Sequence, residues 1–358
     1  MANQTRQLAR LLASDGVKVR LVCSNEPYSP AWLGKIRGVR AVARLLPYRR
    51  ALASASHEVD VMHVMANSGW AWFLLAAPAV RAALRRDVPV IINYRGGLAR
   101  EFLASAPRVV ASMLRAASAV IVPSRFLQGV FAEHGISARI IPNVVNLELF
   151  RPVPRPEGRG RHIVIARSLE AIYGIDTAIR AAAKLHRDFP DLTVSIAGSG
   201  PERAPLERLA AELGVSDRIR FTGRLEPEMV AELYGRADIA LNPSRVDNTP
   251  NSVLEAAASG VPIVSTNVGG VPFLVEHGRS AWLVPPDDPA LMAEGVARLL
   301  RHDALRDSLC AGAAQVAQSC SWAAVGGQWL TLYRQLSERR SDRNRRACED
   351  ANDVHTIL

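Results

Sequence analysis

The 358 residues suffice for two ordinary α/β domains, because a single hydrophobic core stops growing near ~250–300 residues. Apolar residues make up 49% of the chain and charged residues 22%, which excludes a disordered polymer. The net charge of +10 comes from the first 150 residues, which hold 19 Lys and Arg against 8 Asp and Glu, whereas the rest of the chain holds 25 against 26. This asymmetry favours an anionic partner for the first half, either a membrane surface or a polyanion; an Arg-rich proteome is the alternative explanation.

The first half opens on a helix rather than on a strand. Apolar residues at helical spacing predict a helix over 2–16, and 18–24 follows as a short buried strand. A phosphate-binding α/β domain normally leads with a strand and a Gly-rich turn into that helix, so we expect either a start codon further upstream or an impaired form. Four further strands, separated by helical stretches, are expected at 59–65, 89–95, 119–124 and 138–143. Such alternation predicts a parallel, doubly wound sheet.

A second alternating series follows a linker. Residues 151–161 are rich in Pro, Gly and Arg, which divides the chain into an acceptor-binding domain, 1–150, and a donor-binding domain, 151–330. Six strands are expected in the second domain, at 162–168, 192–200, 218–224, 238–244, 262–268 and 281–286. The predicted fold class is α/β, with two Rossmann-like doubly wound parallel-sheet domains facing across a cleft. A helix over 321–337, a candidate to cross back to the first domain, precedes a polar tail, 338–358, that we expect to be disordered.

The cysteines and the apolar stretches bear on location. Cys23, Cys310, Cys320 and Cys348 show neither metal-type pairing nor dense disulfide spacing, which indicates a reducing cytosol. The longest apolar stretch, 69–80, is far shorter than the ~20 residues of a transmembrane helix. We therefore predict a cytoplasmic protein, with a peripheral position at the inner face of the plasma membrane as the alternative. The sequence has no helix-turn-helix, finger or aromatic RNA-reading motif, so no nucleic-acid partner is expected.

Residues 29–56 form a basic amphipathic stretch. It contains no acidic residue and carries six cations between apolar positions, namely Lys35, Arg37, Arg40, Arg44, Arg49 and Arg50. Such a stretch can lie on an anionic leaflet and bring the protein to a lipid-linked partner. The alternative is a solvated helix whose apolar side faces the domain core, because both need the same periodicity.

The most specific pattern begins at Asp247. A turn with two Asn and a Pro follows this carboxylate, and a helix then carries Glu255 on its first turns. Helix N-termini offer unpaired N–H groups and a positive dipole end, so the backbone of 249–253 is expected to hold a diphosphate. Glu255 is placed to accept hydrogen bonds from ribose hydroxyls. The alternative is that Asn248 and Thr249 only cap the helix.

These residues resemble the signature of the family 4 retaining glycosyltransferases, which belong to glycosyl transferases group 1. The signature is a carboxylate, seven residues, then Glu-Ala, small residues, Gly-Val-Pro and a later Gly-Gly-x-Pro; here it consists of Asp247, Glu255, Ala256, Gly260, Val261, Pro262, Gly269, Gly270 and Pro272. The family usually has Glu at the first position, so the shorter Asp247 is expected to alter the contact with the donor sugar. Further motifs at 197–202, 218–225, 237–244 and 277–289 follow the family's order, and the resemblance covers most of the chain.

The resemblance implies a GT-B fold, a nucleoside diphosphate sugar bound in the C-terminal half, an acceptor in the N-terminal half, retention of anomeric configuration, and neither a metal nor another cofactor. Its catalytic candidates are Arg167 for the leaving diphosphate, Asp247 for the sugar hydroxyls and Glu255 for the ribose. A guanidinium neutralises phosphate charge well; the alternative is a surface Arg after a strand. The family's Lys before a Gly is Tyr173 here, and a phenol brings no charge near neutral pH.

The other donor-side candidates follow strands of the second domain. Glycines after a strand let a nucleotide or sugar approach the backbone, although a tight turn explains them equally. The candidates are Gly198, Ser199, Gly200, Gly223, Arg224, Leu225, Asn248, Thr249, Pro250, Asn251, Ser252 and Val253.

The acceptor-side candidates lie at strand ends of the first domain. They are His63 and, where the family carries a T-x-H-G-like turn, Asn93, Arg95, Gly96 and Gly97. The position of His63 near a strand end favours ligand contact, but a lone His is more often structural. Arg95 and the two glycines are candidates for contact with donor phosphate or acceptor.

We therefore predict a metal-independent hexosyltransferase that moves a sugar to a hydroxyl of a lipid-linked or saccharide acceptor, in cell-surface polysaccharide or glycolipid synthesis. No general base is assigned. One alternative is a non-catalytic or impaired nucleotide-sugar-binding GT-B protein, suggested by Tyr173 and the missing Gly-rich loop. Another is a GT-B sugar-nucleotide epimerase, against which the Gly-Gly-x-Pro run argues.

Overall fold

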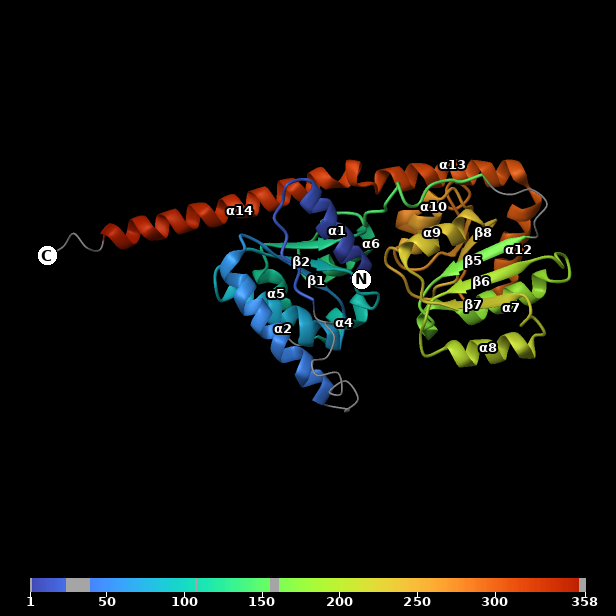
Figure 1. The fold of residues 1–358 in the computed structure, drawn as a ribbon, viewed down its shortest axis with the longest axis horizontal. Helices are drawn as coiled ribbons and strands as arrows, with labels where there is room; N and C mark the ends of the chain where they lie inside the picture. The colour runs from blue at the N-terminus through green and yellow to red at the C-terminus, as the bar shows by residue number, and fades with distance from the viewer. Residues whose placement is uncertain (1, 24–38, 107, 155–160, 354–358) are drawn as a thin grey trace. The chain divides into compact units, whose positions relative to one another are not determined.

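The computed structural model describes residues 2–23, 39–106, 108–154 and 161–353. The chain divides into two compact units, the first made of Met1–Ile141 with Gly326–Leu358 and the second of Pro142–Val325. Each unit contains one parallel sheet with helices packed against it (Figure 1). The first division of the chain thus falls before the boundary predicted at residue 150, and most of the predicted linker, 155–160, lies outside the described residues.

Sheet A, in the first unit, has the strand order β1-β2-β3-β4, and every neighbouring pair is parallel. Its strands are Met62–Ala66 (β1), Val90–Tyr94 (β2), Ala119–Val122 (β3) and Arg139–Ile140 (β4). Three of these strands lie inside ranges predicted from the sequence, and β1 ends at Ala66, one residue beyond the predicted 59–65. His63 stands opposite Ile91 and Met65 opposite Asn93, so these residues share one face of the sheet.

Helices pack on both faces of sheet A. The face that carries Val64 and Ile92 joins the main apolar core of the unit. The helices of this unit that follow the first are Val39–Glu58 (α2), the π-helix Trp72–Ala76 (η2), Ala77–Leu84 (α3), Ala99–Ser105 (α4), Arg108–Ala116 (α5) and Arg125–Glu133 (α6). The face that carries His63 meets the C-terminal helix α14 (Trp322–Asp353), and helix α1 (Ala2–Ser14) lies beside the end of β2.

Residues 18–24 were predicted as a buried strand, and the described part of this range is not one. Residues 18–23 form no strand, and Val19 and Leu21 are 40% and 44% exposed. The reason lies in the side chains between them, because Arg20 pairs with Glu58 at 2.5 Å and with Ser54 at 3.1 Å, both on α2. The segment therefore follows the surface of a helix instead of joining the sheet.

The basic stretch 29–56 lies only partly within the described residues. Residues 29–38 are outside them, and 39–56 belong to α2. On this helix Tyr48 and Leu52 are buried in the core, whereas Leu46 is 52% exposed. The described part of the stretch thus turns one apolar side to the core and still exposes apolar surface.

Sheet B, in the second unit, has the order β10-β9-β8-β5-β6-β7 and is parallel throughout. Its strands are His162–Ala166 (β5), Thr193–Ala197 (β6), Ile219–Gly223 (β7), Ile239–Asn242 (β8), Ile263–Thr266 (β9) and Trp282–Val284 (β10). All six lie inside predicted ranges. The prediction of two α/β units with parallel sheets is confirmed.

Alternate residues of β5 enter two different cores, as the two-residue period of a strand requires. Ile163 and Ile165 join one apolar cluster and Val164 the other. The helices are Ala171–Tyr173 (η3, a 3₁₀ turn), Ile175–Leu185 (α7), Arg203–Glu212 (α8), Pro227–Gly235 (α9), Asn251–Ala258 (α10), Val271–Leu274 (α11), Pro289–Arg301 (α12) and Asp303–Ser319 (α13). Helices α7, α8 and α12 supply the first cluster, and α9, α10 and α13 the second, so both faces of sheet B are covered.

The C-terminal helix α14 begins in the second unit and continues through the first. The predicted disordered tail is wrong for residues 338–353, which extend this helix. Arg340 donates a hydrogen bond to the carbonyl of Val59, and Arg345 pairs with Asp342 one turn away, so polar side chains support the extension. In the part of the chain that the structure describes, no helix is both long and apolar enough to cross a bilayer.

Candidate active site

The carboxyl ends of β5 and β8 form the switch point of sheet B. Strand β5 pairs with β6 on one side and with β8 on the other. The sheet therefore grows from β5 first toward β7 and then, from β8 on, in the opposite direction. Open α/β sheets bind ligands at such points, outside the carboxyl ends of their strands. Arg167 directly follows β5, while Asn242 ends β8 and Ser244 comes two residues later. The predicted cation therefore stands where the topology favours a site.

Arg167 is held by four side chains. Its Nε donates to Asn242 Oδ1 at 2.9 Å, and Nη2 donates to Ser244 Oγ at 3.0 Å. The guanidinium forms an ion pair with Asp247, and its Cζ lies 4.7 Å from the centre of the Tyr173 ring. A cation held in this way is oriented before any ligand arrives, which is what electrostatic stabilisation of a leaving group requires.

The Arg167–Asp247 pair is nearly buried, with side chains 12% and 10% exposed. Burial lowers the pKa of Arg167, while Tyr173, Tyr234 and Glu255 nearby act in the opposite direction. The sequence assigned Arg167 and Asp247 to different parts of the donor, and the structure adds that the two side chains contact each other. The charge of Arg167 is thus balanced within the second unit.

Gly269 and Gly270 set the course of the loop that carries Asp247. Gly269 has a φ of +53°, and a Cβ on it would overlap the carbonyl oxygen of Asp247. A Cβ on Gly270 would overlap that of Asn248, and the N–H of Gly270 donates to Asp247 O at 2.9 Å. Only glycine permits this approach of two loops, so the Gly-Gly pair of the signature has a structural cause.

Helix α10 begins at Asn251, and its N-cap residue Pro250 makes no side-chain capping bond. Within the described residues the Thr249 hydroxyl does not cap the helix either. Thr249 Oγ1 and Ser252 Oγ are buried and make no hydrogen bond within the described residues, whereas the N–H of Val253 already donates to the carbonyl of Pro250 at 3.2 Å. Buried hydroxyls at a helix N-terminus are groups that a bound anion can satisfy.

Asn143 was missed by the sequence reasoning, which assigned it to a strand that in fact ends at Ile140. Its Nδ2 donates to the carbonyl of Thr249 at 3.2 Å and to Asn251 Oδ1 at 2.7 Å, and the residue is only 4% exposed. Asn143 therefore fixes the start of α10 from the first residues of the second unit. The one available signal was an Asn directly after a Pro at a strand end.

Glu255 lies on α10, near Arg167 and Tyr234. Burial raises its pKa from 4.5 to about 7, and Arg167 opposes this shift. Tyr234 of α9 is buried beside it and donates to the carbonyl of Ser252 at 3.0 Å; burial first, and then Glu255, raises the pKa of this phenol. Glu255 thus faces the same site as Arg167 and changes its charge near neutral pH. Its role toward ribose stays a prediction.

Tyr173 ends the turn η3, and Gly174 follows it with a φ of +58°. The phenol packs on Arg167 and supplies no charge. Another cation, Arg245, lies beside this turn, but it donates to Asp176 at 2.8 Å and to Asp287 at 2.6 Å. Because two carboxylates already neutralise Arg245, it does not stand in for the family's Lys.

The glycines after β6 serve the approach of neighbouring loops. A Cβ on Gly198 would overlap the carbonyl oxygen of Arg167, and one on Gly200 would overlap that of Leu169. The N–H of Gly198 donates to the carbonyl of Gly223 at 2.9 Å, which brings the ends of β5, β6 and β7 together. The remaining candidates of this group, Ser199, Arg224 and Leu225, lie on the same edge, the first two of them exposed. Their contact with a nucleotide stays a prediction.

The acceptor-side candidates of the first unit also lie together. Asn93 Nδ2 and His63 Nε2 are 2.9 Å apart, and Arg95 Nε donates to Asn93 Oδ1 at 2.9 Å. A Cβ on Gly96 would overlap Ser68 Oγ of the loop after β1, and Gly97 follows at the same strand end. The structure thus links His63, Asn93 and Arg95 by hydrogen bonds, and Gly96 and Gly97 follow β2. His63, however, is the second residue of β1 and not at its carboxyl end, where the sequence placed it.

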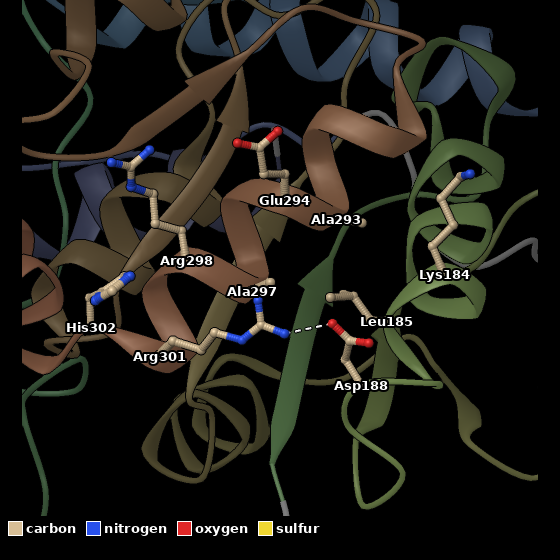
Figure 2. A pocket seen from close by; sticks show the side chains of 9 residues that line it. All are labelled: Lys184, Leu185, Asp188, Ala293, Glu294, Ala297, Arg298, Arg301 and His302. Carbon is tan, nitrogen blue, oxygen red and sulfur yellow. Dashed lines mark hydrogen bonds and ion pairs between the residues drawn. The ribbon is translucent and has the colours of Figure 1, made fainter.

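A separate groove of about 380 Å³ lies between α7 and α12 (Figure 2). It is lined by charged side chains, and Arg301 pairs across it with Asp188 at 2.5 Å. None of the predicted site residues lines it, so the groove carries no argument for a function. Among the described residues, no three His, Cys, Asp or Glu side chains gather in a metal-binding arrangement.

Two protein-family models match consecutive parts of the chain. The model described as Glycosyltransferase Family 4 matches residues 1–149, and the one described as Glycosyl transferases group 1 matches residues 148–316. The second match contains Arg167, Asp247, helix α10 and Gly270.

Curated relatives show the same kinship. The chain is 35% identical over 175 residues to a D-inositol 3-phosphate glycosyltransferase of Corynebacterium urealyticum, an alignment that covers 47% of this chain and 41% of the relative. It is 32% identical over 268 residues to an exopolysaccharide phosphotransferase of Streptomyces coelicolor, which covers 74% of this chain and 27% of the relative. The chain therefore spans less than two thirds of the length of these relatives.

Solved structures share the fold over most of the chain. A sucrose-phosphate synthase from Thermosynechococcus elongatus superposes with a TM-score of 0.74 at 24% identity, covering 93% of this chain and 92% of that one. Anabaena HepE in complex with UDP and glucose gives 0.71 at 19% identity, covering 91% and 88%. At these identities the likeness concerns the GT-B fold alone.

The family models meet at residues 148–149, and between them they cover both parallel sheets and the cation site at the end of β5. The chain belongs to the family 4 glycosyltransferases of glycosyl transferases group 1, with the GT-B fold.

Proposed function

We propose that this protein transfers a sugar from a nucleoside diphosphate sugar to a hydroxyl acceptor, with retention of the anomeric configuration and without a metal ion. The observation that supports it most is the placement of Arg167 at the switch point of sheet B, oriented by Asn242 and Ser244. A fixed guanidinium neutralises the charge that develops on a departing diphosphate.

The N-terminus of α10 supplies the second part of the proposed phosphate site. Thr249 and Ser252 present buried hydroxyls there, and helix N-termini attract anions. Asp247 would bind hydroxyls of the transferred sugar, and Glu255 would accept hydrogen bonds from the ribose once it is ionised. For this, the carboxylate of Asp247 must bind the sugar hydroxyls while it still contacts Arg167.

The acceptor is proposed to be lipid-linked or a saccharide, in cell-surface polysaccharide or glycolipid synthesis. The names of the relatives, an inositol phosphate glycosyltransferase and an exopolysaccharide phosphotransferase, favour this range of acceptors. The excess positive charge of the first 150 residues suits an anionic leaflet, with 29–56 as the contacting stretch and a cytoplasmic location.

A second function has one observation in its favour. Tyr173 replaces the cation that the family carries at this position, and Arg245 does not compensate for it. A protein that binds a nucleotide sugar without transferring it would fit this loss of charge.

Calorimetric titration with UDP-, GDP- and ADP-sugars tests the proposal. The wild-type chain is expected to bind one of them, and Arg167→Ala to lose that binding by at least tenfold. Arg301→Ala removes an Arg of the same unit that pairs with Asp188 outside the site, and should bind like the wild type. Release of the nucleoside diphosphate in the presence of an acceptor, with the product anomer read by NMR, separates transfer from mere binding. Absence of binding to every donor would overturn both functions.

A further inference from the structure

Arg95 stands at the carboxyl end of β2 and is held only by neutral groups. Its Nε donates to Asn93 Oδ1 and its Nη1 to Gln4 Oε1 on α1, both at 2.9 Å. Within the described residues neither of its contacts is a carboxylate, and Nη2 has no protein partner. Burial lowers the pKa of Arg95 to about 10, and no acidic side chain opposes this shift. The fold therefore keeps a largely buried guanidinium without balancing its charge.

The neighbouring His63 cannot supply the missing negative charge and adds no positive charge. Because Asn93 Oδ1 accepts from Arg95, its Nδ2 must donate to His63 Nε2, which leaves Nδ1 of His63 to donate to the hydroxyl of Tyr333. Burial, with a smaller contribution from Arg95, lowers the pKa of His63 to about 3. His63 is thus a neutral side chain whose two nitrogens are both used.

Helix α14 completes this row of hydrogen bonds. The ring of Trp329 stacks on His63 with centroids 5.0 Å apart, and Tyr333 stands beside it. The contacts from Tyr333 through His63 and Asn93 orient Arg95 from one helix and two strands, and Gln4 of α1 holds it from a second helix. These hydrogen bonds fix the direction of a cation that no carboxylate neutralises within the described residues.

Other partly buried cations of the chain are treated differently. Arg167 pairs with Asp247, and Arg245 with Asp176 and Asp287. Taking an ion out of water costs much unless an opposite charge accompanies it. An unbalanced, oriented Arg at the carboxyl edge of a parallel sheet is the arrangement of an anion-binding site that receives its counter-charge from a ligand.

We propose that Arg95 binds an oxyanion, a phosphate or carboxylate group, on the acceptor, so that the acceptor substrate is anionic. The inference rests on the proposed function and names the acceptor class within it. Next to Arg95, the backbone of Gly96 packs directly against Ser68 of the loop after β1, since glycine has no side chain to separate them. Arg95 would bind the charged group, and the hydroxyl that receives the sugar would belong to the same molecule.

Binding of inorganic phosphate is the first measurement, made on Arg167→Ala so that the donor site does not contribute. This parent is expected to bind phosphate, Arg95→Gln added to it to weaken binding at least tenfold, and Arg95→Lys to retain part of it. Arg115→Gln is the matched control, because Arg115 is exposed and precedes β3, at the opposite edge of sheet A. Equal phosphate affinity of the Arg95→Gln and Arg115→Gln proteins would overturn the proposal.

Two further readouts separate the alternatives. Donor binding by Arg95→Gln in the otherwise wild-type chain should be unchanged; a parallel loss of donor affinity would assign Arg95 to the donor diphosphate and overturn an acceptor role. The melting temperature of Arg95→Gln should be equal to or above that of the wild type, because an unbalanced charge has been removed, and a clear decrease with phosphate binding intact would make Arg95 purely structural. If no donor binds to any version, the proposed function fails while phosphate binding at Arg95 is still decided by its own titration.

A matched pair of alcohols extends the test to an acceptor. D-inositol 3-phosphate should bind the wild type at least tenfold more tightly than myo-inositol, and Arg95→Gln should remove that difference. Tighter binding of the uncharged alcohol, or a preference that survives in Arg95→Gln, would contradict an anionic acceptor held by this residue.

Discussion

The carboxyl edges of the two sheets carry the same residue type in opposite electrical surroundings. At the edge of sheet B, Arg167 contacts the carboxylate of Asp247. At the edge of sheet A, the side-chain hydrogen bonds that Arg95 makes within the described residues go to the amide oxygens of Asn93 and Gln4. Because desolvation of an unbalanced charge opposes folding, only the first arrangement is self-sufficient. The difference teaches that two cations that each directly follow a strand of a parallel sheet serve different needs: one is oriented by its own counter-ion, and the other, on our proposal, receives its counter-charge from a ligand.

The two edges also differ in how they respond to pH. The pKa of His63 beside Arg95 is lowered to about 3, so this edge does not titrate near neutral pH. The pKa of Glu255 near Arg167 is raised to about 7, so the other edge does. Burial is the main cause in both cases, and it favours the neutral form of an acid and of a base alike.

The largest effect is expected from Arg167→Ala. The transfer rate should fall at least a hundredfold, because a fixed charge on the leaving diphosphate is lost. The free energy of unfolding should fall by about 3–5 kcal/mol, since Asp247 stays behind nearly buried and unpaired. Donor titration, steady-state kinetics and urea unfolding measure these changes.

Two variants control this prediction. Arg301→Ala breaks an exposed ion pair with Asp188 and should cost less than about 1 kcal/mol. Arg167→Ala combined with Asp247→Ala should recover much of the lost stability without recovering transfer. If the double variant is as unstable as the sum of the two single ones, the ion pair is not the source of the loss.

Asn143→Ala compared with Asn93→Ala tests whether each buried amide serves its own edge. Asn143 holds the carbonyl of Thr249 and the side chain of Asn251 at the start of α10, so its loss should weaken donor binding about tenfold and lower stability by about 1–2 kcal/mol. Asn93→Ala should lower stability to a similar degree and leave donor binding unchanged, because it acts on Arg95 and His63. Similar donor affinities of the two variants would remove the distinction. Calorimetry and chemical unfolding of both proteins provide the data.

Glu255 should give the donor affinity a pH dependence with a defined sign. With a pKa of about 7 in the free protein, the carboxyl is mostly protonated at pH 6 and mostly ionised at pH 8. The ionised form accepts hydrogen bonds from the ribose, so donor affinity should rise roughly tenfold between these values. Stability should change in the other direction: the folded pKa lies above the ordinary 4.5, so the contribution of Glu255 is fully present below pH 4.5 and is lost as pH rises through about 7.

Glu255→Gln should flatten both pH profiles, while Glu212→Gln, which alters an exposed Glu on α8, should leave them as they are. A donor affinity that still rises tenfold in Glu255→Gln would assign the titration to another group. The edge of sheet A offers no candidate among the residues around Arg95, because the low pKa of His63 keeps it neutral over this range.

The sequence predicts the sheets well because most of their strands are short apolar runs that are largely buried, and this pattern can be recognised from the run alone. Nine of the ten strands lie inside predicted ranges, and β1 exceeds its range by one residue, Ala66. The segment 18–24 misled the prediction because its alternation of apolar and basic residues fits an isolated strand, whereas the pairing of Arg20 with Glu58 on α2 decides its place. Tertiary contacts of this kind have no local signal.

The candidate site was predictable where a motif carries it and not where distant side chains meet. Arg167, Asp247 and Glu255 were found from their motif, and the structure brings them to one edge. Their pairing, the support from Asn143, and the absence of a carboxylate at Arg95 among the described residues all depend on contacts between segments far apart in the chain.

The smallest expected effect comes from Tyr173→Lys, which makes the edge of sheet B more positive. The ring of Tyr173 lies 4.7 Å from the Cζ of Arg167, so an ammonium group there would reach the same phosphate region. Donor affinity should rise about threefold to tenfold, because one charge-assisted contact is added while the packing on Arg167 is lost. Tyr173→Phe keeps the packing and should leave affinity within about twofold of the wild type, whereas removal of the ring in Tyr173→Ala should weaken binding. An unchanged or weaker affinity in Tyr173→Lys would mean that Arg167 and the start of α10 already satisfy the diphosphate. The edge of sheet B would then need no further cation, and the difference between the two edges would depend on Arg95 alone.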